Sequence, residues 1–280
     1  MYKIVRKKVL NPTVVLMDIE APYVAKKVEP GQFIILRTDE NGERIPLTVA
    51  DFDREAGTVT IIFQIVGGTT GKLSEMEEGD YLQDFAGPLG TPSKLDGFRK
   101  VAVIGGGVGC AIAYPVAKKL SELGCEVHTV AGFRNRDLVI LEDEFAAVSD
   151  VLKIMTDDGS YGEKGLVTNA LEALINDGNK YDEVVAIGPL VMMKFVCQLT
   201  KKYDIKTTVS MNPIMIDGTG MCGGCRLTVG GETKFACVDG PDFDGHLVDF
   251  DEAMKRGAMY KEFEAHAREN SCNLFRKSAE

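Results

Sequence analysis

The sequence predicts an antiparallel β domain, then a parallel α/β domain, then a small carboxyl-terminal segment. In residues 1–97 apolar residues recur with a period of two, as in GQFIILRT and TVTIIFQIV, with turn signals at Asn41-Gly42 and Ala56-Gly57. From residue 98 short apolar runs alternate with helical patterns, which is typical of a buried parallel sheet. Glycines and cysteines gather after residue 212. We therefore expect domains at residues 1–97, 98–212 and 213–280.

The composition excludes several classes of function. Hydrophobic residues make up 45% of the 280, and no apolar run approaches the roughly 20 residues of a membrane helix. The formal net charge of -10 disfavours general nucleic-acid binding, which needs a basic face. The amino terminus shows no export signal, so we expect a cytoplasmic protein.

The α/β region contains one helix that can be read residue by residue. Apolar residues recur at spacings of three or four, Pro115 stands near the first turns, and Gly124 follows as a stop signal. The predicted strands are KVAVIGGG, EVHTVAGF, VLKIMT, EVVAIG and KTTVS. The apolar face of the helix consists of Val108, Ile112, Val116, Leu120 and Leu123.

Two glycine loops follow strands of this region. VIGGGVGCA carries Gly105, Gly106, Gly107 and Gly109, and VVAIGPLVMM carries Gly188 and Pro189. Glycines at a helix start let backbone N–H groups approach a phosphate, and ligands gather at the carboxyl ends of parallel strands. The spacing is not G-x-G-x-x-G, so a tight turn is the alternative, but the α/β context favours nucleotide binding.

The β domain holds two stretches of a similar kind, ERIPLTVADFD and VGGTTGKLSEMEEGD. In the second, glycines and threonines at residues 67–71 are expected to stand just before a short helix, where an anion can bind. The alternative is that both stretches are ordinary turns without a ligand. The adjoining α/β domain makes this alternative less favoured than anion binding.

Three of the seven cysteines cluster in the pattern D-x4-C-x2-C-x11-C, formed by Asp217, Cys222, Cys225 and Cys237. Plant-type iron–sulfur sites use C-x4-C-x2-C and a distant cysteine in a glycine-rich loop. We interpret the loop as a 2Fe-2S site with Asp217 in the first ligand position, and zinc ranks second. Asp217 can alternatively hydrogen-bond the loop while another group completes the shell. The scattered Cys110, Cys125, Cys197 and Cys272 are expected to be buried apolar residues.

The three histidines give no sign of acid–base catalysis. His128, His246 and His266 are dispersed, and neither an HExxH helix nor a Ser/His/Asp arrangement is present. We expect no catalytic side chain.

These motifs, in this order and over nearly the whole chain, resemble the ferredoxin-NADP reductase superfamily. The chain is most similar to the branch that contains the electron-transfer subunit of dihydroorotate dehydrogenase and the small subunit of NADH-dependent ferredoxin:NADP oxidoreductase. The resemblance implies an FAD-binding β-barrel, a Rossmann-like NAD-binding domain and a 2Fe-2S loop. It rests on PLTVADFD, GGTTGKLSEMEEGD, GPLG, VIGGGVGCA, TDDGSYGEKGLVT, AIGPLVMM and the cysteine loop.

The resemblance also implies site residues. The implied FAD contacts are Pro46, Leu47, Thr48, Val49, Ala50, Ile65, Gly67, Thr70, Gly71, Lys72 and Leu73. The implied dinucleotide contacts are Gly105, Gly106, Gly107, Gly109, Asp157, Asp158, Gly159, Gly188 and Pro189, with TDDGSYG near the nicotinamide end. The family arginine stands three residues before the Ser/Thr, where this chain has Ile45. Arg44 lies one residue earlier, and one residue reverses the face of a strand.

The implied function is electron relay. A hydride would pass between NAD(H) and FAD, and electrons would leave through the 2Fe-2S cluster to a larger flavin and iron–sulfur subunit in a heterodimer, where electron bifurcation would occur. NADH is favoured by the resemblance, although Arg134 and Arg136 can meet a 2′-phosphate. One alternative is an NAD-linked dihydroorotate dehydrogenase subunit, which would normally have cysteine at position 217. The other is a non-catalytic zinc- or nucleotide-binding module.

Overall fold

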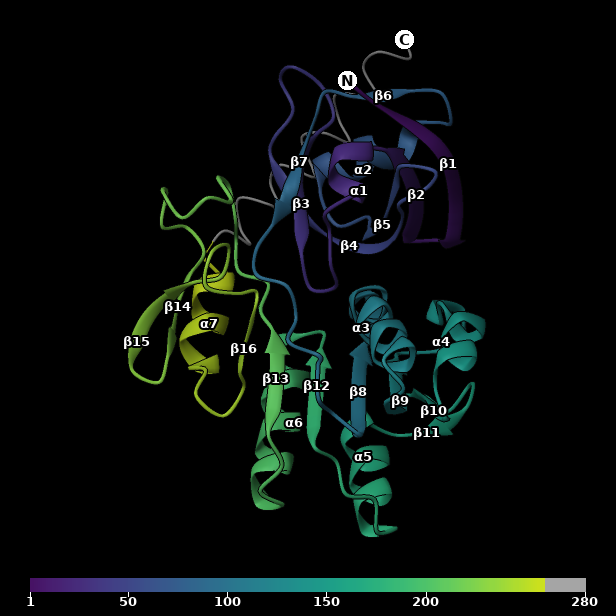
Figure 1. The fold of residues 1–280 in the computed structure, drawn as a ribbon, viewed down its shortest axis with the longest axis vertical. Coiled ribbons are helices and arrows are strands. Elements are labelled where there is room, and N and C mark those ends of the chain that lie inside the picture. The colour runs from purple at the N-terminus through teal and green to yellow at the C-terminus, as the bar shows by residue number, and fades with distance from the viewer. Residues whose placement is uncertain (260–280) are drawn as a thin grey trace.

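The computed structural model describes residues 1–259, arranged as a barrel, a sheet domain and a smaller carboxyl-terminal segment (Figure 1). The sequence FDEAMKRGAMYKEFEAHAREN predicts a surface helix, which begins as α7 (Phe250–Gly257). The remainder of this stretch lies outside the described residues, as do His266 and Cys272. No helix within residues 1–259 combines the length and the apolar character that crossing a bilayer requires.

The first sheet is antiparallel and curls into a nearly closed barrel, as predicted. Its strand order is β6-β1-β2-β5-β4-β3-β7, and inward-facing side chains such as Met17, Ile61 and Phe85 are fully buried. The elements are β1 (Tyr2–Asn11), β2 (Val14–Glu20), α1 (Pro22–Ala25), β3 (Phe33–Arg37), β4 (Ile45–Asp53), β5 (Thr58–Gln64), α2 (Gly68–Glu75), β6 (Tyr81–Leu82) and β7 (Asp84–Leu89).

The second sheet has the order β11-β10-β9-β8-β12-β13-β16, with every pair parallel except β13 and β16. Helices α3 and α4 pack on one face, and α5 and α6 on the other. The elements are β8 (Lys100–Gly106), the 3₁₀ turn η1 (Gly107–Gly109), α3 (Cys110–Glu122), β9 (Glu126–Phe133), η2 (Arg136–Leu138), α4 (Glu142–Val148), β10 (Val151–Thr156), β11 (Glu163–Lys164), α5 (Val167–Asn176), β12 (Glu183–Ile187), α6 (Leu190–Lys202) and β13 (Thr207–Ser210).

Helix α3 follows the predicted periodicity with one exception. Val116 and Leu120 are buried, but Leu123 is 46% exposed. The helix ends at Glu122 and Leu123 is its C-cap, so the apolar face stops one turn earlier than predicted. Gly124 has a φ of 79°, as expected of a residue that ends a helix.

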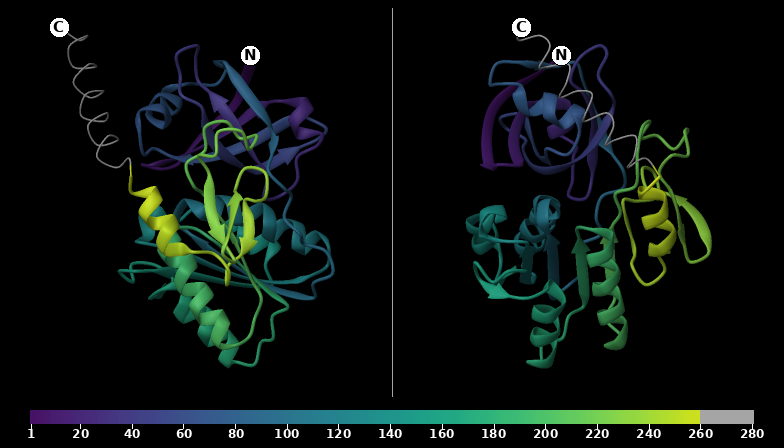
Figure 2. Two further views of the ribbon diagram at one scale, coloured as in Figure 1. Left: turned by 90° about the vertical axis from the view of Figure 1, so that its left-hand side faces the viewer. Right: turned by 180° about the vertical axis from the view of Figure 1, so that it is seen from behind.

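The carboxyl-terminal segment is joined to the second sheet. A hairpin, β14 (Arg226–Val229) and β15 (Glu232–Phe235), turns through two glycines, and β16 (Asp242–Asp244) pairs antiparallel with β13. Helix α7 lies against α6, where Lys194 Nζ is 2.7 Å from Asp251 Oδ1. Figure 2 shows this segment lying beside both the sheet domain and the barrel. The domain boundaries after residues 97 and 212 stay predictions.

Helix α3 also packs against the barrel. Val14, Leu16, Ala50 and Ile62 of the barrel share a core cluster with α3. Lys118 Nζ lies 2.8 Å and 3.0 Å from the two carboxylate oxygens of Asp51 on β4. This contact fixes the barrel over the carboxyl-terminal edge of the parallel strands.

Candidate functional site: a cleft and a cysteine loop on either side of the barrel

A cleft of about 540 Å³ lies between the barrel and the carboxyl-terminal edge of the second sheet. The barrel contributes Asn11, Thr13, Val14 and Gln64. The sheet domain contributes the loops after several strands and the first turn of α5. The predicted residues that line it are Gly106, Gly107, Gly109, Asp157, Gly188 and Pro189.

The strand order places this cleft at a topological switch point. Strands β10, β9, β8, β12 and β13 lie side by side, so the connections after β8 and β12 leave in opposite directions. Ligands of open α/β sheets bind outside the carboxyl ends of the strands at such a point. The two glycine loops predicted from sequence therefore meet in space, as expected.

Gly109 shows why a side chain is excluded at this crossing. A Cβ built on Gly109 would stand 2.6 Å from Ile187 O and 2.7 Å from Gly188 Cα. Both contacts are backbone, which no rotamer change can relieve. The start of α3 thus approaches the end of β12 closely enough for both loops to face one ligand.

The segment TDDGSYG is split by the structure. Asp157 lines the cleft, whereas Asp158 is turned to Ser160, whose hydroxyl and N–H lower the pKa of that carboxyl. Arg134 also lines the cleft. The Arg136 guanidinium lies 5.4 Å from the centre of the Tyr161 ring.

The residues implied for FAD lie on β4 and α2 of the barrel. Pro46, Leu47 and Thr48 are partly exposed, while the side chains of Val49, Ala50 and Leu73 are buried, so these three can offer only backbone to a ligand. Ile65, directly after β5, is 36% exposed.

Helix α2 differs from the prediction in where it begins. The glycines were expected before the helix, but Gly67 is its N-cap and Gly68 and Gly71 lie inside it. The Thr70 hydroxyl accepts the N–H groups of Val66 and Gly67, both at 3.0 Å, and this capping draws the loop into the helix. Lys72 forms an ion pair with Asp39.

The cysteine loop wraps its backbone around sulfur. Cys225 Sγ and Cys237 Sγ are 3.2 Å apart and buried, whereas Cys222 is exposed. The Gly224 N–H points to Cys222 Sγ at 3.4 Å and lowers the pKa of this thiol. Burial and the neighbouring Cys225 raise the pKa of Cys237 to about 11.

Comparisons with known proteins agree with this geometry. Residues 212–249 match the iron–sulfur cluster binding domain of dihydroorotate dehydrogenase B. A dihydroorotate dehydrogenase B (NAD(+)) electron transfer subunit homolog of Thermotoga maritima is 49% identical over 94% of this chain and 92% of its own length. A protein described as uncharacterized, in the adh 3′ region of Clostridium beijerinckii, is 54% identical over 95% of this chain and 93% of its own.

A solved structure is similar over almost its full length. It is a chain of the NADH-dependent reduced ferredoxin-NADP oxidoreductase, from work on flavin-based electron bifurcation. Its TM-score is 0.92, with 47% identity over 97% of this chain and 98% of that chain. This chain belongs to the family of dihydroorotate dehydrogenase B electron-transfer subunits and their homologues.

The sulfur donors of this family member fit a binuclear cluster better than a single ion. Within residues 1–259 no three His, Cys, Asp or Glu side chains surround one point as a single metal ion requires. Cys225 Sγ and Cys237 Sγ form one close pair, and the backbone N–H of Asp217 is directed to Cys222 Sγ. A 2Fe-2S cluster takes two protein ligands on each iron, and the match of residues 212–249 to an iron–sulfur cluster binding domain supports this group over zinc.

Asp217 is already engaged within the loop. One carboxylate oxygen, Oδ2, accepts from Thr219 N at 2.9 Å, Thr219 Oγ1 at 2.6 Å and Met221 N at 3.1 Å. The Thr219 hydroxyl is the main cause of the lowered pKa of Asp217. The other oxygen remains available, so the ligand role and the loop-bonding role of this residue are compatible.

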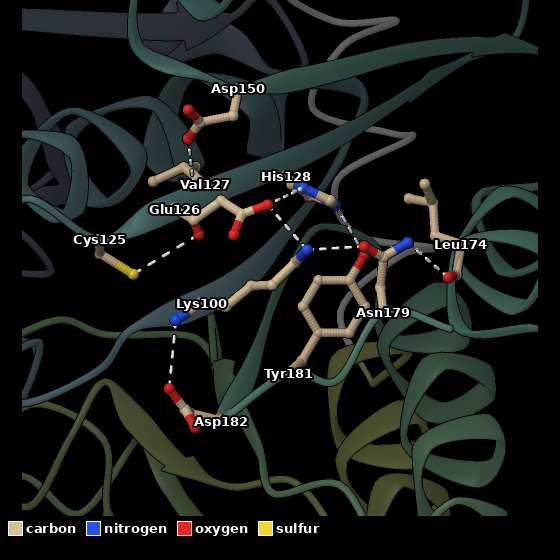
Figure 3. A network of polar contacts seen from close by, with 10 residues as sticks. All are labelled: Lys100, Cys125, Glu126, Val127, His128, Asp150, Leu174, Asn179, Tyr181 and Asp182. Carbon is tan, nitrogen blue, oxygen red and sulfur yellow. Dashed lines mark hydrogen bonds and ion pairs between the residues drawn. The ribbon is translucent and has the colours of Figure 1, made fainter. Parts of the chain in front are cut away.

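The buried His128 belongs to a polar network with Glu126, Lys100 and Tyr181 (Figure 3). His128 Nδ1 is 2.9 Å from Tyr181 Oη, and Nε2 is 3.0 Å from Glu126 Oε1, which also binds Lys100 Nζ. Burial lowers the pKa of His128. This network joins the first residues of β8 and β9, whereas the cleft lies beyond their last residues, so His128 has a structural role.

Sequence reasoning missed the contribution of the barrel to the cleft. Asn11, Thr13 and Gln64 lie at the ends of strands and carry no motif. Met192 lies within the predicted loop VVAIGPLVMM, whereas Phe195, one turn further along α6, was not singled out. No signal in the sequence marks Asn11, Thr13 or Gln64, because they reach the cleft only through the packing of the barrel against the sheet domain.

Proposed function

We propose that this chain is the electron-transfer subunit of a complex of the NADH-dependent ferredoxin:NADP oxidoreductase type. It takes electrons from NADH and passes them to a larger catalytic partner subunit. The supporting observation is that the barrel contacts both the cleft and the cysteine loop. Its strand ends line the cleft, and β3, β7 and Arg44, which directly precedes β4, contact the cysteine loop.

The cofactors proposed are FAD, NAD(H) and a 2Fe-2S cluster. FAD supplies the conversion between a two-electron hydride and the single electrons that the cluster carries. On the protein side, the partly exposed stretch Pro46–Thr48 and the start of α2 would hold FAD. Gly106, Gly107 and Gly109 would bind the NADH pyrophosphate by backbone N–H groups, and Asp217, Cys222, Cys225 and Cys237 would hold the cluster.

In this proposal the residues of the chain bind and orient the cofactors, and no side chain transfers a proton. Val14, Ile140 and Met192 add apolar surface to the walls of the cleft, and this surface would shield a bound nicotinamide from water. The loop glycines allow N–H groups to point to sulfur. A cytoplasmic location belongs to the same proposal, because cluster ligands must stay reduced.

A dihydroorotate dehydrogenase subunit is the second candidate, favoured by the match of residues 212–249. The two candidates share the electron path and differ in the partner. Purification from the native cell, followed by assay of the associated subunit for dihydroorotate oxidation, separates them. An associated chain with further flavin and iron–sulfur centres and no such oxidation supports the first.

The test of the shared path is anaerobic purification followed by absorbance and low-temperature EPR, with NADH and NADPH titrated separately. We expect NADH to bleach the flavin and to produce a 2Fe-2S signal. In Asp217→Ala that signal is expected to change or disappear, with flavin bleaching retained. Glu232→Ala, an exposed change in the same segment, is the control. A colourless, zinc-containing protein would refute the proposal.

A further inference from the structure

Three arginines from three different elements donate hydrogen bonds to the backbone of the cysteine loop. Arg44, directly before β4, places Nε 3.1 Å from Ile216 O and Nη2 3.4 Å from Asp217 O. Arg226 Nη1, on β14, is 3.1 Å from Gly223 O. Arg256 Nη2, on α7, is 3.3 Å from Gly224 O. Both ends of the loop are therefore held by guanidinium groups.

Arg44 is the contact that connects the loop to the barrel. It precedes Ile45, and neighbouring residues of an extended strand point to opposite faces. Arg44 stands one residue earlier in the chain than the family arginine does. This difference of one position turns the Arg44 side chain to the cysteine loop. It occupies a position between the strand proposed for FAD and the loop proposed for the cluster.

The loop is seated on the barrel beside this arginine. Gly218 has a φ of 81°, and a Cβ built there would stand 2.6 Å from Ile35 Cδ1 and 2.9 Å from Leu89 Cδ1. Ile35 is the register partner of Pro46 on β4. The loop backbone thus packs on β7 and on β3, and β3 pairs with the strand proposed for FAD. Arg44 donates its hydrogen bonds to the same loop.

The charge of the arginines matters as much as their hydrogen bonds. The chain carries a net charge of -10, so three guanidinium groups on one short loop are a local departure from its average. The thiolates and carboxylate proposed as ligands are anionic, and reduction of the cluster adds one more negative charge. Fixed positive charge nearby stabilises the reduced state more than the oxidised state.

We propose that Arg44, Arg226 and Arg256 form an arginine clasp that positions the ligand loop and raises the reduction potential of its cluster, with Arg44 setting the loop against the flavin strand. This inference rests on the proposed function. It adds positioning residues that touch the loop carbonyls rather than the cluster ligands' side chains.

The test compares wild type with Arg44→Gln, Arg44→Lys, Arg226→Gln and Arg256→Gln. Arg6→Gln is the matched control, because Arg6 is also an exposed arginine but pairs with Asp18 on β1 and β2, away from the loop. For each protein we would measure flavin absorbance, iron content, the cluster midpoint potential by EPR-monitored titration, and amide hydrogen exchange of residues 214–224 before cluster loading.

We expect each glutamine variant to keep its flavin and to show a lower cluster potential, with Arg44→Gln changed most. Loop amides of unloaded Arg44→Gln should exchange roughly fivefold faster than those of wild type. Arg44→Lys keeps the charge but not the planar fork, so its potential should return toward wild type while its exchange stays faster. Arg6→Gln should match wild type in every reading.

Unchanged potentials in all three glutamine variants would overturn the inference. Loss of flavin from Arg44→Gln, with the cluster potential unaltered, would also overturn it and assign Arg44 to the flavin phosphate. A wild-type protein without a 2Fe-2S signal would instead refute the proposed function, so the two failures are distinguishable.

Discussion

Replacement of Gly109 by alanine is expected to weaken both the packing of α3 and the binding of NADH. Gly109 has φ -60° and ψ -20°, so alanine suits the backbone there and the whole effect comes from contact. The new Cβ would lie 2.6 Å from Ile187 O, and ordinary contact starts at 3.4 Å, so the start of α3 must move away by about 0.8 Å.

The expected cost follows from what α3 packs against. Because the contacts are with the backbone of β12, the shift is transmitted to the core shared by α3, the sheet and the barrel. Forcing extra volume into such a core costs about 1–3 kcal/mol. A shift of that size also moves the N–H groups of the loop out of hydrogen-bonding range of a phosphate. Loss of about 1.4 kcal/mol there weakens NADH binding about tenfold.

Urea unfolding and a fluorescence titration with NADH measure the two effects. Gly257→Ala is the control, because a Cβ there meets no atom within 4 Å and the residue lies at the end of α7, far from the cleft. If Gly109→Ala matched this control in both stability and NADH affinity, the close approach of α3 to β12 would not be needed for the site.

Two further predictions concern the barrel and the buried carboxylate. Gly71→Ala should stabilise the flavin-free protein by about 0.5–1 kcal/mol, because the residue lies inside α2 with open space around it. The same change should weaken FAD retention if the flavin phosphate lies there. Unchanged FAD content after gel filtration would remove Gly71 from the proposed FAD site. Asp242 is half-buried, but its carboxyl is enclosed and bonded to Ser93, and burial raises the pKa of this carboxyl. The folded state therefore binds the proton more tightly, and stability is lost as the pH rises above about 4. Asp242→Asn removes that loss. In thermal unfolding, the stability of the variant relative to wild type should therefore rise by an amount of order 1 kcal/mol as the pH increases from about 4 to about 8. A stability difference that does not depend on pH would contradict the raised pKa of Asp242.

The segments with strong local patterns were predictable from sequence. The period-two stretches became β3 and β5, and the five apolar runs became β8, β9, β10, β12 and β13. The phosphate-binding loop between β8 and α3 was predictable from its glycines, and the sulfur-ligand loop from the spacing of its three cysteines. Both depend on a few adjacent residues. Prediction succeeds there because the physical cause, side-chain alternation or backbone freedom, lies within a few residues of chain.

Other features depended on capping by one side chain, on the residue at which a helix ends, or on contacts between distant segments. The start of α2 was misplaced because the Thr70 side chain caps it, and Leu123 was exposed because the helix ended one residue before it. The β16 edge strand pairs with β13 over more than 30 residues of intervening chain, with no motif to announce it.

The sequence by itself determined which backbone can bind phosphate and which loop can hold sulfur ligands, since both follow from local residue types. Only the tertiary structure decided that Asn11 and Gln64 complete the cleft and that Arg44 reaches the loop 172 residues away. Those assignments depend on how the barrel packs against α3 and against Gly218, and packing is set by the shapes of surfaces from separate parts of the chain.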